Sequence, residues 1–247
     1  MKIRFLIILL MVLITASCAF EKNNVNTEPA EKESSPKVYD TSAKTQEKEY
    51  TGIPEEKYIY YSEDVPSAIR DMMWGVTISE RSIINFDDLS YLSMTYYGYD
   101  NAYHVGHMVV DKRLANEVIE IFEQLCINKF PIEKMQLPCE FGGVDEVSMT
   151  ANNTSAFNDR PLDDYGSLSY HQLGQAIDIN PLYNPYINFT NNDIQPKAGE
   201  VYLDRNREDV GMIKNDSFCV QLFKKYGWEW GGDWSGLKDY QHFEKSI

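Results

Sequence analysis

Ser169-Tyr-His-Gln-Leu-Gly-Gln-Ala-Ile-Asp178 is the stretch around which this chain is organised. It places His171 and Asp178 seven residues apart, and these side chains are a candidate nitrogen ligand and a candidate oxygen ligand for a metal such as zinc. Gly174, between them, permits a turn that other residues resist. The alternation over residues 176–180 predicts a short strand whose two isoleucines face a core while Asp178 points the other way. Spacing alone leaves open that the histidine and the aspartate are unrelated structural residues.

A catalytic zinc site needs a third protein ligand and a position for water. His242 follows Asp239 by three residues, and the two side chains share a face if this segment is a helical turn. A zinc site made of His171, Asp178 and His242, with Asp239 as a base beside it, is the arrangement expected for hydrolysis of an amide.

Other hydrolase signatures are missing from the sequence. The helix motif H-E-x-x-H does not occur. The serine-hydrolase motif G-x-S-x-G is absent around Ser167 and Ser169. His104 and His107 lie three residues apart on a predicted strand, where their side chains face opposite sides. We therefore expect a structural or surface role for these two histidines.

Three separated motifs resemble the zinc D-alanyl-D-alanine carboxypeptidase family, which also includes L-alanyl-D-glutamate endopeptidases of phage and bacteria. The motifs are S-x-H-x-x-G-x-A-x-D at residues 169–178, Ser155-Ala-Phe-Asn-x-Arg160 before it, and Gly-Trp-x-Trp-Gly-Gly-x-Trp followed by Asp239-x-x-His242-Phe243 near the end. The resemblance runs from about residue 70 to the C-terminus. It implies an α+β fold like that of Hedgehog proteins and DD-peptidases, with a small antiparallel sheet that bears the zinc site and helices packed on one side.

The resemblance also implies roles for individual residues. It makes His171, Asp178 and His242 the zinc ligands, Asp239 the general base, Arg160 the group that polarises the scissile carbonyl or holds substrate, and Ser169 a group that orients a ligand or binds a substrate carboxylate. A surface salt bridge for Arg160 and a purely structural hydroxyl for Ser169 remain open. The base is Glu in many carboxypeptidases and Asp in some endopeptidases, which favours the endopeptidase branch here.

The expected function is zinc-dependent hydrolysis of a peptide bond in peptidoglycan stem peptides, of the D-Ala-D-Ala carboxypeptidase or L-Ala-D-Glu endopeptidase type. The alternative is a non-catalytic zinc- or wall-binding lipoprotein, as in Hedgehog-like relatives that keep the metal and lose turnover. Asp239 argues against this alternative, because a binding module has no need for a base.

The N-terminus predicts export. Residues 1–17 have a basic start and a short apolar run like those of a lipoprotein signal peptide, and they end before Cys18, the expected lipidation site. An ordinary secretory signal is the alternative, because Thr15 stands where a lipobox has Leu. Residues 18–55 are polar and predict a disordered tether to the bacterial membrane. Residues 56–247 are then expected to form the peptidase domain that the resemblance implies. The net charge of −15 argues against nucleic-acid binding, and we expect a monomer in the cell envelope.

The rest of the chain predicts further elements. They are a short helix or turn over 65–74, strands over 87–97 and 103–110, an amphipathic helix with Asp111 as its N-cap, a long connection over 181–211, and a helix over 220–226 ended by Gly227. Trp228 and Trp230 are expected in the core. A Cys126–Cys139 disulfide and buried free thiols both remain open.

Overall fold

The computed structural model describes residues 58–159 and 168–247, all within one compact unit that spans Thr51–Ile247. The expectations for the signal peptide, for Cys18, for the tether up to residue 55 and for Arg160 lie outside the described residues. Among the described residues, no helix has both the length and the apolar character needed to cross a membrane.

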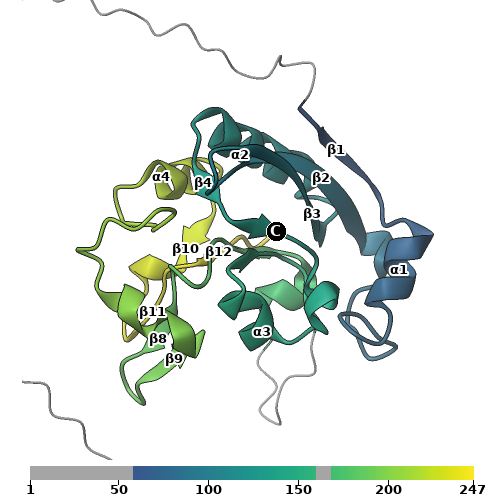
Figure 1. Cartoon of the computed structure of the whole chain (residues 1–247). Coiled ribbons are helices and arrows are strands. Elements are labelled where there is room, and N and C mark those ends of the chain that lie inside the picture. Colours follow the sequence, from purple (N-terminus) through teal and green to yellow (C-terminus); the bar gives the residue numbers. More distant parts are fainter. Residues whose placement is uncertain (1–57, 160–167) are drawn as a thin grey trace, which may run out of the picture. The chain divides into compact units, whose positions relative to one another are not determined.

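The largest sheet is built from the first half of the unit (Figure 1). Strand β2 (Leu89–Gly98) pairs antiparallel with β1 (Tyr60–Asp64) and with β3 (Tyr103–Asp111), and it pairs parallel with the short β4 (Pro131–Ile132). These bounds confirm the two long strands predicted from sequence. Helix α1 (Ser67–Met73) confirms the predicted short helix between β1 and β2.

Helix α2 (Ala115–Ile127) packs its apolar face on this sheet. Its stripe at three- and four-residue spacing (Val118, Ile121, Phe122 and Leu125) is buried together with Leu92 and Met94 of β2 and Met108 of β3. The predicted cap at Asp111 is wrong. Asp111 ends β3, and its carboxylate accepts hydrogen bonds from Arg113 N (2.9 Å) and Gln175 Nε2 (3.1 Å) instead of capping the helix.

A second antiparallel sheet has the order β10-β12-β7, in which β7 is Ala176–Asp178, β12 is His242–Glu244 and β10 is Glu229–Trp230. Helix α4 (Phe218–Lys225) packs against it, and the Phe223 ring stacks on the Phe243 ring with centroids 4.1 Å apart. Trp228 and Trp230 are buried here, which confirms their predicted place in the core.

A third antiparallel sheet has the order β11-β8-β9. Strands β8 (Tyr186–Asn188) and β9 (Asp193–Gln195) lie in the segment predicted to be a long connection, which also contains the 3-10 helix η5 (Lys197–Leu203). β11 (Leu237–Asp239) pairs with β8, so Asp239 lies on β11 and His242 lies on β12. The helical turn considered for residues 239–242 is therefore wrong. Asp239 pairs with Tyr186 of β8, some 50 residues earlier, and this pairing outweighs the local three-residue spacing that would suit a helical turn.

The remaining elements are short. They are η2 (Phe86–Asp88), β5 (Lys134–Met135), η3 (Pro138–Phe141), α3 (Asp145–Thr150), β6 (Asn153–Thr154), η4 (Tyr170–Leu173) and η6 (Gly231–Asp233). The predicted α+β class is confirmed in its coarse form, with several small antiparallel sheets in place of one. Cys126, Cys139 and Cys219 are free thiols, so the alternative of a Cys126–Cys139 disulfide is wrong.

Gly174 gives a test of how tightly the turn before β7 is held against the large sheet. Its φ is +69°, and a Cβ there would lie 2.5 Å from Asp111 N in β3. Gly75 has a similar φ of +76° with open space around it. We expect Gly75→Ala to lower the free energy of unfolding by about 1 kcal/mol, and Gly174→Ala by about 3 kcal/mol because overpacking adds to the backbone cost. Urea titration measures both; equal losses would contradict close packing of this turn.

Candidate metal centre

His171 is held by a turn that residues 169–174 form. Ser169 caps η4: its Oγ accepts a hydrogen bond from His171 N (3.2 Å), while its own N donates to the Gln172 side chain (2.9 Å). Gly174 then ends the turn in the left-handed conformation, and β7 follows. The structure therefore gives Ser169 a structural hydrogen bond next to the cluster described below.

Asp178 and His242 are brought together by strand pairing. β12 runs antiparallel to β7 in a register that places His242 opposite Asp178, although 64 residues separate them in sequence. The next pair in the ladder, Phe243 and Ile177, is fully buried. Because side chains alternate along a strand, burial of this pair turns His242 and Asp178 to the opposite face of the sheet.

Three ligand atoms converge at this place. His171 Nε2 lies 3.2 Å from His242 Nδ1, His242 Nδ1 lies 3.1 Å from Asp178 Oδ1, and Asp178 Oδ1 lies 3.3 Å from His171 Nε2. Ligand atoms about 2.0 Å from a tetrahedral zinc ion are about 3.3 Å apart. The triangle of donor atoms therefore has the size and the chemistry that a tetrahedral metal with one further open position requires.

The charges of the cluster depend strongly on one another. Burial opposes ionisation of Asp178, but the two histidines outweigh it and hold the pKa of its carboxyl below the usual range. Burial also disfavours the charged form of His242, yet hydrogen bonds to Asp178 and Glu244 raise its pKa to about 10.

Asp239 lies beside the cluster at the end of β11. The residue is half-buried, but its Oδ1 is shielded from solvent and has no hydrogen-bond partner among the described residues. Burial, reinforced by the nearby charge of Asp178, raises the pKa of its carboxyl above the usual range. A shielded carboxylate oxygen without a partner is a group that can accept a proton from a water at this site.

The other histidines lie elsewhere, as their strand positions predict. His104 contacts Asp100 (2.9 Å) on the surface, and His107 Nδ1 lies 3.1 Å from Ser93 Oγ on the large sheet. Neither belongs to the cluster of His171, Asp178 and His242.

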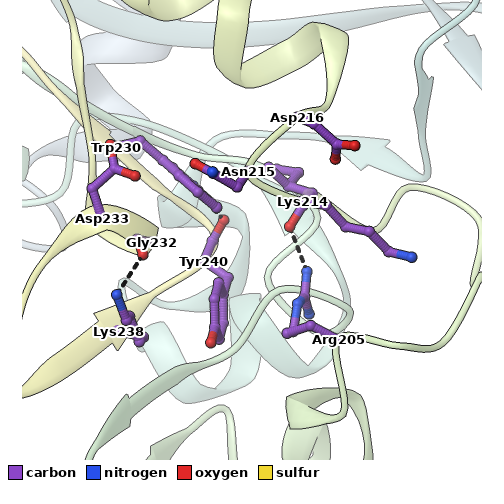
Figure 2. Close-up of a pocket in the computed structure, with 10 residues that line it drawn as sticks. Arg205, Lys214, Asn215, Asp216, Trp230, Gly232, Asp233, Lys238 and Tyr240 are labelled. Atoms are coloured by element: carbon purple, nitrogen blue, oxygen red, sulfur yellow. Dashed lines mark hydrogen bonds between the residues drawn. The ribbon is translucent and has the colours of Figure 1, made fainter.

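A cavity of about 490 Å³ lies next to β11, and nothing in the sequence motifs indicated it (Figure 2). Lys238 and Tyr240, the neighbours of Asp239 in the chain, line this cavity. The Arg205 guanidinium stacks 4.4 Å from the centre of the Tyr240 ring and donates to Ile213 O (2.6 Å). Arg205 also donates to Asn184 Oδ1, so it joins the segment around η5 to the turn before β8 and, through its stacking, to Tyr240 directly after β11.

Comparison with known proteins gives two matches. The model of a family described as D-alanyl-D-alanine carboxypeptidase matches residues 163–245, which contain the three clustered side chains and Asp239. The peptidoglycan L-alanyl-D-glutamate endopeptidase CwlK of Bacillus subtilis (strain 168) is 35% identical over 80 residues, which are 32% of this chain and 40% of that protein. The chain thus matches less than half the length of this curated relative. No solved structure matches. Over residues 163–245 the chain is therefore similar to the D-alanyl-D-alanine carboxypeptidase family.

Proposed function

We propose that this protein hydrolyses peptide bonds in the stem peptides of peptidoglycan, in a reaction that depends on zinc. The observation that carries the proposal is the convergence of His171 Nε2, Asp178 Oδ1 and His242 Nδ1 next to the shielded, unpartnered Oδ1 of Asp239. Two imidazoles and a carboxylate are ligands that zinc accepts, and three protein ligands are the number that a catalytic site uses. The family match and the relative's named activity support the substrate class.

His171, Asp178 and His242 would hold the ion. When bound, zinc supplies a positive charge that lowers the pKa of a water to about 7 and polarises the carbonyl under attack.

Asp239 acts as the general base. Its Oδ1 accepts one proton from the attacking water and then delivers it to the nitrogen of the leaving amine. A carboxyl whose pKa is raised by burial suits both transfers, because it holds a proton more firmly than an exposed carboxylate and still releases it near neutral pH. We assign Arg160, which lies outside the described residues, to the oxygen of the scissile carbonyl, where a cation stabilises developing negative charge. Ser169 stays a proposed substrate contact in addition to its capping bond.

We favour the L-alanyl-D-glutamate endopeptidase type over the D-alanyl-D-alanine carboxypeptidase type. Asp at position 239 is the base found in some endopeptidases, and the curated relative is named for that bond. The proposed setting is the bacterial cell envelope, with a monomer anchored by lipid at Cys18 and a polar segment that lets the domain reach the wall.

The alternative is a zinc- or wall-binding protein without turnover. A module that only binds metal gains nothing from a shielded carboxylate that costs folding free energy beside the ligands. The presence of Asp239 at this position therefore favours a hydrolytic enzyme over a protein that only binds zinc or the wall.

Removal of metal tests zinc dependence. The purified protein should release peptides from peptidoglycan, lose this activity after treatment with a chelator, and regain it when zinc is added. Mass spectrometry of the products distinguishes the bond, because an endopeptidase exposes the amino group of D-glutamate whereas a carboxypeptidase releases free D-alanine. Equal release in the chelator would refute the zinc proposal, and no release by the zinc-loaded protein would favour the binding alternative.

Substitution of Asp239 tests the base. Asp239→Asn should lower kcat by about 10²- to 10⁴-fold, because proton transfer in the transition state is lost, while one zinc per chain is retained. Asp233→Asn is the matched control: Asp233 is exposed, pairs with Lys224 and should leave kcat unchanged. Zinc content is measured by metal analysis and kcat by peptide release. Loss of zinc from the Asp239→Asn variant would mean that Asp239 is a ligand.

Asp239→Asn should lower kcat but raise the stability of the metal-free protein. In the metal-free folded protein Asp239 keeps its proton at pH values where the unfolded chain has lost it, because burial raises its pKa. The folded state therefore binds more protons, and its stability falls as the pH rises from about 4 towards neutral. Asp239→Asn should stabilise the chelator-treated protein by about 1 kcal/mol or more near pH 7 and leave its stability unchanged below about pH 4. Urea unfolding at both pH values is the measurement; a less stable variant at pH 7 would contradict the argument.

A further inference from the structure

We propose that Glu244 is a positioning residue for the metal centre: it holds the outward ring nitrogen of His242 and so makes Nδ1 the nitrogen that faces the metal. This inference rests on the proposed role of His242 as a ligand. The Oε2 atom of Glu244 lies 2.9 Å from His242 Nε2, and the sequence motifs that pick out Asp239 and His242 do not include Glu244.

The two ring nitrogens of His242 have different surroundings. Nδ1 faces the cluster, 3.1 Å from Asp178 Oδ1 and 3.2 Å from His171 Nε2, while Nε2 faces Glu244. A neutral imidazole carries a hydrogen on one nitrogen and a lone pair on the other. A carboxylate only accepts. If Asp178 serves as a ligand of the ion, Glu244 is the acceptor left to His242, so it would keep the hydrogen on Nε2 and leave the lone pair of Nδ1 for the ion.

Strand geometry explains why Glu244 reaches this nitrogen. Residues two apart on a strand share a face, so His242 and Glu244 of β12 lie on the same side of the sheet. The residue between them, Phe243, is fully buried and stacks on α4, which fixes the register. Directly across the ladder, Glu244 faces the small Ala176 on one side and the like-charged Glu229 on the other.

His171 offers a contrast within the same site. Its Nδ1 donates to the backbone carbonyl of Ala156 at 2.6 Å, which leaves Nε2 for the metal. The two histidines therefore present different nitrogens, and each is oriented by a different kind of acceptor. Ala156 supplies a neutral backbone oxygen that no substitution removes, whereas Glu244 supplies a charged side chain. A carboxylate partner increases the basicity of a ligand imidazole, and loss of such a partner typically lowers metal affinity about 10- to 100-fold.

Zinc affinity of the purified protein, measured by competition with a chelator of known affinity, tests the proposal without any substrate. Glu244→Ala should weaken zinc binding about 10- to 100-fold. Glu244→Gln, which keeps an acceptor oxygen and loses the charge, should weaken it less. Glu229→Gln is the matched control, because this exposed glutamate pairs with Glu244 on the neighbouring strand and contacts no ligand in the described residues; its affinity should equal that of the wild type. Thermal melts in chelator verify that each variant folds.

The tautomer gives a second readout that a merely structural role would not change. In the zinc-loaded wild type, ¹⁵N NMR should show His242 protonated at Nε2, with Nδ1 as the ligand atom. In Glu244→Ala this Nε2–H signal should shift and exchange faster with solvent, while the signal of His171 Nδ1–H, held by Ala156, stays unchanged.

The outcomes separate this proposal from the proposed function. Wild-type zinc affinity in Glu244→Ala, or a wild-type His242 that coordinates through Nε2, would overturn the role of Glu244 even if the protein cleaves peptidoglycan. Conversely, a protein whose zinc affinity depends on Glu244 but which releases no peptide would refute the peptidase proposal and support the role of Glu244.

Discussion

The antiparallel pairing of β7 with β12 is the constraint on which the centre depends. It places His242 opposite Asp178 on one face, and Phe243 beside Ile177 on the other. The buried pair fixes the register, because a slip by one residue would move the aromatic ring out of the core and the imidazole into it. Hydrophobic packing thus holds in place two polar groups that attract or repel each other according to their protonation.

Much of this arrangement follows from local sequence. The alternation after Gly174 predicts the strand that carries Asp178, and the stripe on α2 predicts the helix that covers the large sheet. These patterns can be recognised because burial of one face makes apolar residues recur every 2 residues in a strand or every 3.6 residues in a helix. The resemblance also selects His242 from the four histidines, and the structure brings His242 to His171 and Asp178.

Other parts depend on partners far apart in the chain, which a local pattern does not encode. Asp239 lies on a strand because β8, some 50 residues earlier, pairs with it; the three-residue spacing to His242 suggests a helical turn instead. Asp111 satisfies the rule for a helix cap, but Gln175 and Arg113 take up its carboxylate. The acceptors behind the two histidines, a backbone carbonyl and Glu244, are likewise visible only once the strands are paired.

Two of the proposed metal ligands and the proposed base lie on different sheets. Asp178 and His242 belong to the β10-β12-β7 sheet, while Asp239 belongs to the β11-β8-β9 sheet, and only Tyr240 and Gln241 connect β11 to β12. Insertions or substitutions in the β8–β9 hairpin can therefore displace Asp239 and leave the triangle of His171, Asp178 and His242 intact. Few changes would therefore convert a hydrolase of this architecture into a protein that binds metal without turnover. A protein engineer could make the opposite change by returning a carboxylate to position 239.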